Sequence, residues 1–542
     1  MKRLFLLVAM ALFATVNICS AQKSKDVDEQ VRRFVNLQMN DQLEEAAELA
    51  DSMLTLYPTN ADVLHLKASS LNDRGQVEEA LEYQNLALKS WKKRGFYSKS
   101  LLHFFSATYH YQLEDIESAL IDIEQGIELI KKDEKVVYVN LLMLRARCYY
   151  YISEFESAYA DLAEVLYTSD EDSDIEYALV GMCHIALEAE NYERAILVAK
   201  ALNEVSGVCH DSLHTLALAY RELGENHLAI DNAVLMLLID SGDAESRELK
   251  YILLSDPEYS KQLIDKYAAE DPDHEYALEF IILYQLCHEY DSMIPLFEYL
   301  DEDRNSLLSN YATFSALAGK YDDAVAYVTE LIANCPEDDI ESRCYHFAMR
   351  NLYHIMMGAY DLSAADAQEI INLIPDSAFG YYLMGYSLDY MGDDAQALDY
   401  YNKCLSIDDE NYTHAYLLRG EQYLKSGQTE LAKHDFERVL ELDTVAEDGS
   451  YRQFALHYLG RDAEAIEWMR EIIYSDPYDF DFYFTAACLY ATMGEIYQSL
   501  DHLNIALMLG YNSKAQIENS DYLDPVRDTD VYRSMMDQYF GN

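Results

Sequence analysis

The sequence predicts an all-α protein built from stacked helical hairpins, and three observations carry this prediction. Only 19 of the 542 residues are glycine and 8 are proline, which leaves little room for the many turns of an all-β protein. Small residues recur at a nearly constant spacing along the chain, and a glycine often stands five residues before them. A period of about 34 residues accommodates a helix, a turn and a second helix.

Composition excludes several classes of function. The chain has 97 Asp and Glu against 40 Lys and Arg, a net charge of −57, but 50% of its residues are hydrophobic, so it is folded. This charge argues against binding nucleic acid, because phosphates are recognised by Lys and Arg. It also disfavours anionic membrane surfaces. Long-range steering by the same charge favours basic partners.

The N-terminus has the features of a secretory signal peptide, which we place at residues 1–21. Lys2 and Arg3 precede an apolar stretch at 4–16, and small residues follow at 19–21. We therefore expect an exported protein, periplasmic or secreted. The alternative is a lipid anchor on Cys19, although the preceding Ile18 is not the small residue that bacterial lipidation requires. No later stretch is long and apolar enough for an integral membrane span.

The recurring small residues form a ladder of thirteen positions, which we call rungs. The rungs are Ala46, Ala80, Ala119, Ala158, Ala195, Ala229, Met293, Ala324, Ser363, Ala397, Ala432, Ala465 and Ser499. Their spacing is 31 to 39 residues except for one gap of 64, between Ala229 and Met293, which indicates a degenerate repeat. Such regular spacing is typical of a repeat protein whose hairpins share one core.

The residues around each rung explain the hairpin. Eight rungs have a glycine five residues earlier: Gly75, Gly224, Gly319, Gly358, Gly392, Gly427, Gly460 and Gly494. Glycine ends the first helix because it enters the left-handed region without strain. A small residue twelve positions before the rung, such as Gly385 or Gly420, allows the second helix to approach. Prolines such as Pro375 and Pro477 then end the second helix.

With these offsets, for example in Gly392–Leu398 (GDDAQAL) and Gly319–Val325 (GKYDDAV), the chain resembles the tetratricopeptide repeat family over nearly its whole mature length. The resemblance implies a right-handed superhelical solenoid of about 13–14 helix-turn-helix repeats. It also implies that the first helix of each repeat lines the inner surface.

The repeats divide the chain into segments. We expect an N-terminal array at 22–243, a degenerate repeat or hinge at 244–273, a C-terminal array at 274–512 and a capping segment at 513–542. The capping segment is expected because Tyr522–Asp528 resembles the tail that often closes such arrays.

The sequence contains none of the catalytic motifs searched for. There is no glycine-rich phosphate loop, nucleophile elbow or H-E-x-x-H zinc motif, so no enzyme, cofactor or metal is expected. Cys335 and Cys344 flank a predicted turn and either pair in an oxidising compartment or remain buried thiols. The acidic runs at 170–174 and 337–339 precede first helices, where carboxylates cap free amides, rather than marking cation sites.

The best candidate for a binding surface is aromatic. Phe379, Tyr382, Tyr386 and Tyr390 lie at helical spacing on one face, which by the family resemblance points into the groove. Similar positions hold Phe104, Tyr111, Arg147 and Tyr150. Tyrosine suits a groove because its ring offers contact area at low entropic cost. The alternative is that these rings pack against the next repeat.

Together these features predict an exported scaffold that binds a protein or peptide partner in its groove without catalysis. One alternative is a carbohydrate-active helical-repeat enzyme using paired carboxylates. The other is a passive structural spacer of an envelope assembly. Fold alone does not separate these functions.

Overall fold

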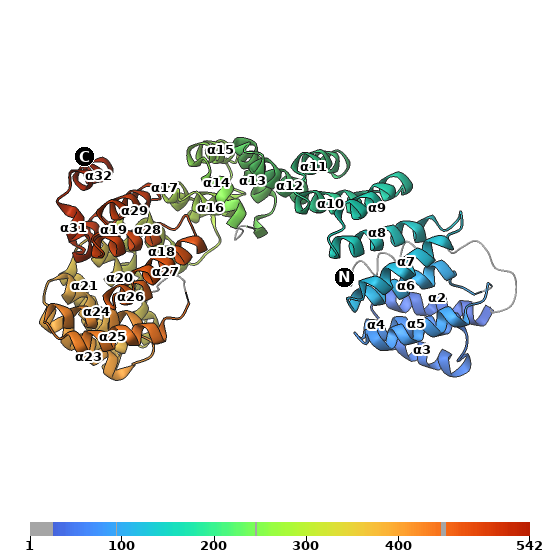
Figure 1. Ribbon diagram of the computed structural model, residues 1–542, viewed down its shortest axis with the longest axis horizontal. Coiled ribbons are helices and arrows are strands. Elements are labelled where there is room, and N and C mark those ends of the chain that lie inside the picture. Colours follow the sequence, from blue (N-terminus) through green and yellow to red (C-terminus); the bar gives the residue numbers. More distant parts are fainter. Residues whose placement is uncertain (1–24, 94, 244–246, 446–450, 542) are drawn as a thin grey trace. The chain divides into compact units, whose positions relative to one another are not determined.

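The structure is a computed structural model that describes residues 25–93, 95–243, 247–445 and 451–541. These residues form helices joined by short turns, with no β-strand among them, so the predicted all-α class is confirmed (Figure 1). In the described part of the chain, no helix combines the length and the apolar character that a membrane crossing needs. The predicted signal peptide at 1–21, with Cys19, lies outside the described residues.

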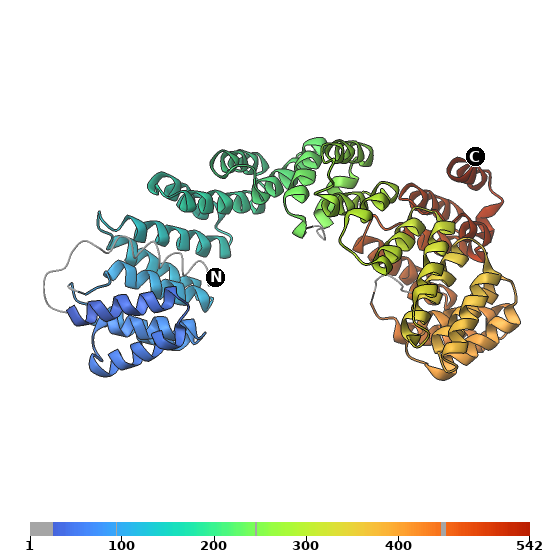
Figure 2. The same ribbon diagram turned by 180° about the vertical axis from the view of Figure 1, so that it is seen from behind.

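The chain divides into two compact units, which we call the N-terminal unit (residues 1–263) and the C-terminal unit (residues 264–542). The division falls inside 244–273, where the sequence predicts a degenerate repeat or hinge. Within each unit the helices follow one another in consecutive pairs (Figures 1 and 2).

The N-terminal unit begins with six regular pairs of helices. They are α2 (Lys25–Met39) with α3 (Leu43–Leu56), α4 (Ala61–Asp73) with α5 (Val77–Ser90), α6 (Lys99–Gln112) with α7 (Ile116–Glu128), α8 (Lys135–Tyr151) with α9 (Phe155–Thr168), α10 (Asp172–Glu188) with α11 (Tyr192–Ser206), and α12 (His210–Glu222) with α13 (Asn226–Ile239). The short η1 (Ser241–Asp243) leads to a less regular segment of two helices, α14 (Arg247–Leu254) and α15 (Pro257–Ala269), of which α14 packs on α13 and α15 crosses the boundary between the units. The helix α14 has only eight residues.

The C-terminal unit begins with an irregular pair, α16 (Ala277–Leu286) and α17 (Tyr290–Met293), and α17 continues as the 3-10 helix η2 (Ile294–Tyr299). Pro295 lies at the start of η2 and lacks the amide hydrogen that would extend an α-helix. Six regular pairs follow. They are α18 (Arg304–Leu317) with α19 (Tyr321–Asn334), α20 (Ile340–Met356) with α21 (Tyr360–Leu373), α22 (Ala378–Tyr390) with α23 (Asp394–Ile407), α24 (Thr413–Lys425) with α25 (Thr429–Leu442), α26 (Arg452–Tyr458) with α27 (Asp462–Ser475), and α28 (Phe480–Thr492) with α29 (Ile496–Met508).

After the last pair come four short elements. They are α30 (Lys514–Asn519), η3 (Asp521–Leu523), α31 (Asp524–Arg527) and α32 (Asp530–Phe540). Across both units the described residues therefore form thirteen packed helical pairs and the irregular helices α14 and α15, in agreement with the predicted 13–14 repeats.

The rungs and the turns lie where the sequence predicts them. None of the thirteen rung residues is more than 1% exposed. The residue five positions before each rung has a φ between +53° and +79°. Eight of these residues are the predicted glycines, and the other five are Asp41, Glu114, Ser153, Glu190 and His288. The backbone conformation of the turn is thus constant along the chain, whereas glycine is not required everywhere.

The small residue on the first helix is needed for close packing. A Cβ atom on Gly385 would lie 2.7 Å from the ring of Tyr401, and one on Gly420 would lie 2.6 Å from the ring of Phe436. Both rings belong to the second helix of the same pair and are almost fully buried. Glycine at these positions therefore creates the space that a large aromatic residue of the second helix fills.

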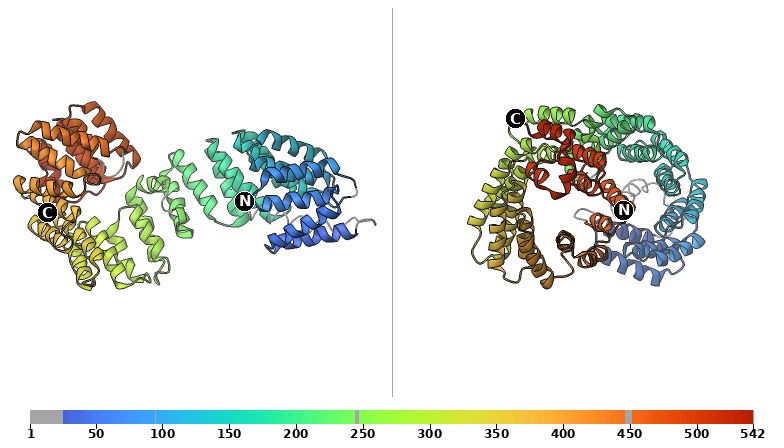
Figure 3. Two further views of the ribbon diagram at one scale, coloured as in Figure 1. Left: turned by 90° about the horizontal axis from the view of Figure 1, so that it is seen from below. Right: turned by 60° about the vertical axis from the view of Figure 1, so that its left-hand side comes forward.

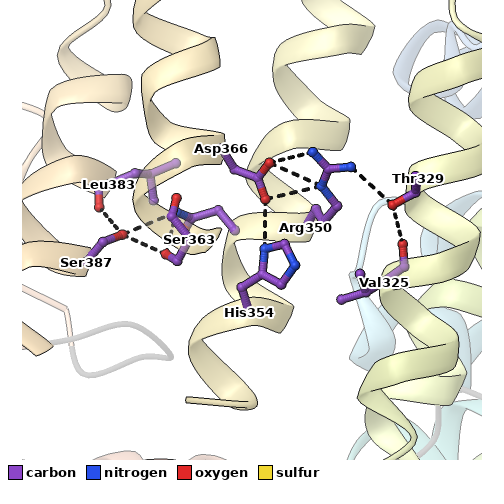
Figure 4. Close-up of polar contacts among 9 residues, drawn as sticks. Val325, Thr329, Arg350, His354, Ser363, Asp366, Leu383 and Ser387 are labelled. Carbon is purple, nitrogen blue, oxygen red and sulfur yellow. Dashed lines mark hydrogen bonds and ion pairs between the residues drawn. The ribbon is translucent and has the colours of Figure 1, made fainter. Parts of the chain in front are cut away.

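Three pairs of helices are also joined by a buried ion pair that we did not predict. An arginine of the first helix binds an aspartate sixteen residues later on the second helix: Arg145 with Asp161, Arg350 with Asp366, and Arg419 with Asp435. In the middle pair the guanidinium Nη2 of Arg350 lies 2.6 Å from a carboxylate oxygen of Asp366, and Nδ1 of His354 lies 2.9 Å from the other (Figure 4). Two partners on one buried carboxylate fix the two helices relative to each other.

The polar rung residue Ser363, in the same region, has hydrogen-bond partners for its hydroxyl. The hydroxyls of Ser363 and Ser387 lie 2.6 Å apart, and the side-chain amide of Asn351 donates to the Ser363 hydroxyl at 2.7 Å (Figure 4). All three residues are fully buried. Serine can therefore replace alanine at this rung because its hydroxyl has partners.

Within each unit the first helices lie on the inner side of the curve. First helices of successive pairs contact one another directly, for example α6 with α8, α10 with α12 and α20 with α22, whereas second helices of successive pairs approach one another less closely. A stack of pairs curves toward the side on which its members approach more closely. We call the surface lined by the first helices the inner face of each unit.

Candidate functional site

Tyr111, Arg147 and Tyr177 lie on three successive first helices of the N-terminal unit. The guanidinium carbon of Arg147, on α8, lies 4.9 Å from the ring centre of Tyr111, on α6. Burial raises the pKa of Tyr177, on α10, and the positive charge of Arg147 opposes that shift. Arg147 therefore lies over a tyrosine of the preceding repeat, and its charge also acts on a tyrosine of the following repeat.

Arg147 differs from the arginine two positions earlier. Arg145 donates to both carboxylate oxygens of Asp161, at 2.7 and 2.8 Å. In the described part of the chain, no carboxylate forms an ion pair with Arg147. In a protein with 97 acidic residues, an unpaired guanidinium on an aromatic surface has hydrogen-bond donors to offer a ligand.

The remaining candidates in this unit separate into surface and core. Tyr150 is 40% exposed, and its ring centre lies 5.9 Å from that of Phe155. Phe104 is only 8% exposed and packs edge-on against Phe105 at 5.5 Å. We therefore assign Tyr111, Arg147, Tyr150 and Tyr177 to what we call the N-terminal site, whereas Phe104 belongs to the hydrophobic core.

The four candidates of the C-terminal unit lie on α22, and three of them contact their own chain. The Tyr382 hydroxyl lies 2.8 Å from Nδ1 of His414, on the next first helix. The rings of Tyr386 and Tyr390 meet edge-on at 5.2 Å. The Tyr390 ring stacks on Tyr360 at 5.0 Å. Tyr382 and Tyr390 therefore follow the alternative interpretation of the sequence, in which the rings pack against neighbouring repeats.

Burial makes this cluster electrically neutral. It lowers the pKa of His414 to about 3 and raises the pKa of Tyr382 well above its usual value. The His414 ring also stacks on Tyr451 at 3.8 Å. Phe379, at the start of α22, is 39% exposed and is the most accessible of the four predicted residues. Most of the aromatic surface predicted for this unit is therefore used for packing.

The inner face of the C-terminal unit is further covered by residues that follow the last repeat. Glu421, on α24, accepts hydrogen bonds from the hydroxyls of Tyr522 at 2.7 Å and Tyr458 at 3.0 Å. Nζ of Lys425 lies 3.0 Å from a carboxylate oxygen of Asp521. We call Asp389, Glu421, Lys425, Phe454 and Tyr458 the C-terminal inner face, and residues 511–527 the tail segment.

The carboxyl groups of the C-terminal inner face have unusual pKa values. Burial raises the pKa of Glu421 to about 7, although the hydrogen bonds from its two tyrosines partly oppose this. Burial likewise raises the pKa of Asp389 to about 6, opposed by the charge of Lys425. Both groups therefore titrate close to neutral pH.

The sequence also raised the possibility of metal ligands, of a disulfide and of acidic cation sites. Among the residues that the structure describes, no three His, Cys, Asp or Glu side chains are grouped as metal ligands. Cys335 and Cys344 are free thiols. Asp339, in the second acidic run, caps α20 by accepting from the Ser342 amide, and hydrogen bonds from the Ser342 side chain and amide lower the pKa of Asp339. The first run has no such side-chain cap on its helix.

Sequence comparison identifies repeats in the C-terminal unit. The model of the tetratricopeptide repeat matches residues 380–411 and 413–444, which contain α22 to α25. No curated protein matches the sequence.

Among solved structures, the chain is similar to a chain of a Naa15/Naa10 complex bound to HypK-THB, with 13% identity, 95% of this chain and 91% of that chain covered, and a TM-score of 0.36. It is also similar to a chain of the APC/C hetero-tetramer Cut9-Hcn1, with 14% identity, coverage of 96% and 98%, and a TM-score of 0.31. MamA matches 32% of this chain and 92% of its own, with 15% identity and a TM-score of 0.23. At such TM-scores these structures carry no information about a partner.

Proposed function

We propose that this chain, which matches the tetratricopeptide repeat at residues 380–411 and 413–444, is an exported, non-catalytic repeat scaffold that binds an extended segment of a partner protein at the N-terminal site. Export is proposed from the signal-like residues 1–21. The observation that carries the binding proposal is Arg147, whose guanidinium lies over the ring of Tyr111 and forms no ion pair with a carboxylate of the described chain.

The proposed mode of binding follows from the chemistry of these side chains. Arg147 offers a planar set of donors that suits backbone carbonyls or a carboxylate of the partner. Tyr111 and Tyr150 offer ring area with a hydroxyl at the edge, and aromatic residues and arginine are enriched at interface positions that dominate affinity. The net charge of −57 steers partners with a basic surface toward the molecule, while the N-terminal site supplies the local contacts.

One observation bears on the carbohydrate-active alternative. Sugar-binding sites favour exposed indole rings, and the chain has two tryptophans. Trp91 is half-buried and donates its indole N–H to the Tyr97 carbonyl at 3.0 Å. Trp468 is half-buried, with Arg452 placed 4.9 Å from the centre of its ring. Neither is a free stacking platform, so we favour a protein partner.

The test compares capture by the mature chain and by two arginine variants from an envelope extract. We expect Arg147→Ala to reduce retention of the partner about tenfold, which corresponds to about 1.4 kcal/mol of binding free energy. Arg194→Ala is the matched control, because Arg194 also lies over a tyrosine ring, Tyr159 at 4.7 Å, but on a second helix.

The outcome distinguishes binding by local contacts at the N-terminal site from binding by long-range electrostatic steering. Retention that is lost with Arg147→Ala but not with Arg194→Ala, and that persists at high salt, supports the N-terminal site. Equal retention by all three chains would exclude Arg147 from the binding surface.

A further inference from the structure

The tail segment inserts apolar side chains into the C-terminal unit. Ile517, Leu523 and Val526 are 0% exposed, and the Tyr511 ring stacks on Phe484 of α28 at 4.2 Å. The elements α30, η3 and α31 contact α20, α28 and α29. In Figure 3 the red tail lies against the yellow and orange helices of the same unit.

The tail segment also reaches helices far earlier in the sequence. The side-chain amide of Asn512 donates to the Leu317 carbonyl at 2.7 Å, and the Ser513 hydroxyl donates to the Met356 carbonyl at 2.9 Å. Both carbonyls lie in the last turn of a first helix, where the helix itself supplies no partner. The tail therefore closes the C-terminal unit by satisfying helix ends that the repeats leave open.

The next part of the tail uses polar and aromatic contacts with the C-terminal inner face. Tyr522 donates to Glu421 at 2.7 Å and stacks on Phe454 with ring centres 5.1 Å apart. Asp521 pairs with Lys425 at 3.0 Å, and both side chains are well exposed, at 73% and 42%. These contacts resemble a peptide–protein interface: a half-buried aromatic anchor with an exposed ion pair at its edge.

The tail is distinct from the repeat that precedes it. It follows the last rung hairpin and carries no rung of its own, and the chain passes from α29 into it through Leu509 and Gly510, whose φ is +108°. Because it follows the last helical pair, it can leave the inner face without interrupting the stack of helical pairs. Its tether gives it a high effective concentration, so an outside segment must compete with it.

We propose that the C-terminal inner face is a second peptide-binding surface, which the tail segment fills in cis and which accepts from a partner protein a segment of the same chemistry. That chemistry is an acidic residue followed by tyrosine and an apolar residue in a helical turn, as in Asp521-Tyr522-Leu523. This proposal is independent of the N-terminal site.

The experiment measures binding of a labelled synthetic peptide of residues 511–530 to the full chain by fluorescence anisotropy. In the Leu523→Asp chain the tail is disengaged, whereas the inner face keeps its own residues. We expect this chain to bind the peptide at least about tenfold more tightly than the wild-type chain, whose tail competes. Adding Lys425→Glu should abolish the gain, because it repels Asp521 of the peptide.

A matched peptide with Tyr522→Ala and Leu523→Asp serves as the control and should not bind. Failure of the parent peptide to bind a Leu523→Asp chain of wild-type helicity would overturn the proposal, because the tail would then be a fixed cap. A wild-type chain that dimerises by tail exchange would also overturn it, since the occupant would be a second copy rather than a partner.

A second measurement applies where Leu523→Asp fails to fold. Hydrogen exchange of the wild-type chain should be faster at residues 514–527 than in α28, because a detachable tail opens locally. Equal exchange in the tail and in α28 would show that the two unfold together, and the proposal would be wrong.

Discussion

The two units use the same helical pair, but their inner faces differ. In the N-terminal unit Arg147 lies over Tyr111, and among the described residues no carboxylate forms an ion pair with it. In the C-terminal unit the corresponding surface is covered by the tail, with Tyr522 bonded to Glu421. The comparison teaches that the repeat determines the architecture, while residues outside the repeat determine which surface a partner can reach.

The turns differ between the units in a second way. Among the residues five positions before a rung, four of the six in the N-terminal unit are not glycine, whereas in the C-terminal unit His288 is the single exception among seven. Non-glycine residues in this conformation cost free energy. The N-terminal turns thus retain backbone strain that the C-terminal turns avoid.

The largest expected effect is on the buried ion pairs. Asp366→Ala leaves the Arg350 guanidinium without its carboxylate, and we expect the C-terminal unit to lose about 3 kcal/mol of unfolding free energy. Asp161→Ala should cost the N-terminal unit less, because Arg145 and Asp161 are more exposed, at 23% and 8%, than Arg350 and Asp366, at 20% and 3%.

The two tryptophans allow each unit to be followed separately. Trp91 lies in the N-terminal unit and Trp468 in the C-terminal unit, so denaturant unfolding of Trp91→Phe and Trp468→Phe chains reports one unit each. Replacing Arg350 and Asp366 together by Met and Leu should restore much of the loss. An equal loss from Asp161→Ala and Asp366→Ala would contradict the difference in burial.

The next effect concerns the small residue of the first helix. Gly420→Ala places a Cβ 2.6 Å from the Phe436 ring, and we expect it to destabilise the C-terminal unit by about 2 kcal/mol. At the matching position of the N-terminal unit, Ala146 already fits, so Ala146→Gly should cost about 1 kcal/mol through helix propensity alone. Stability gained by Gly420→Ala would refute the packing argument.

A smaller effect is expected at the turns, and its sign differs between the units. Gly392 has a φ of +75° and open space around its Cβ position, so Gly392→Ala should cost about 1 kcal/mol through backbone strain alone. Ser153→Gly, in the N-terminal unit, removes such strain and should stabilise by a few tenths of a kcal/mol after the entropy cost of glycine. The same tryptophan-resolved unfolding measures both changes.

The smallest effect is a pH dependence of tail docking. The pKa of Glu421 in the docked state is about 7, above that of a free glutamate, so docking takes up a proton. Its stability is greatest below the free value and falls as pH rises through about 7. Asp389, Lys425, Tyr458 and Tyr522 also face this carboxyl and contribute to the shift.

Hydrogen exchange in the tail, corrected for the intrinsic rate, should therefore be slower at pH 6 than at pH 8. Glu421→Gln should remove most of this difference, since the amide does not titrate. A tail whose protection is the same at both pH values would contradict the pKa shift of Glu421.

Much of the fold could be predicted because its determinants repeat along the sequence. The rung position of Ala397 recurs thirteen times, and a glycine like Gly392 stands five residues before eight of these rungs, so both the turn and the buried rung were identified. The ion pairs could also have been predicted from the sequence, because Arg350 and Asp366 share a sixteen-residue spacing with two other pairs, but this regularity was missed. Repetition is what makes a single sequence informative.

The candidate site was less predictable because its contacts occur only once and do not repeat along the chain. Tyr522 and Glu421 are 101 residues apart, and no repeat offset connects them. Phe104 occupies a first-helix position similar to those of the surface residues, yet neighbouring rings such as Phe105 bury it. Offsets within a repeat therefore predict which residues lie on first helices, but not which of them the rest of the chain covers.

The most direct test of the difference between the two inner faces is hydroxyl-radical labelling of tyrosines in the wild-type and Leu523→Asp chains. We predict that Tyr150 is labelled equally in both chains, whereas Tyr458 and Tyr522 are protected in the wild type and become labelled when the tail is disengaged. Equal labelling of Tyr458 and Tyr522 in both chains, with helicity unchanged, would contradict the conclusion that the tail covers the C-terminal inner face.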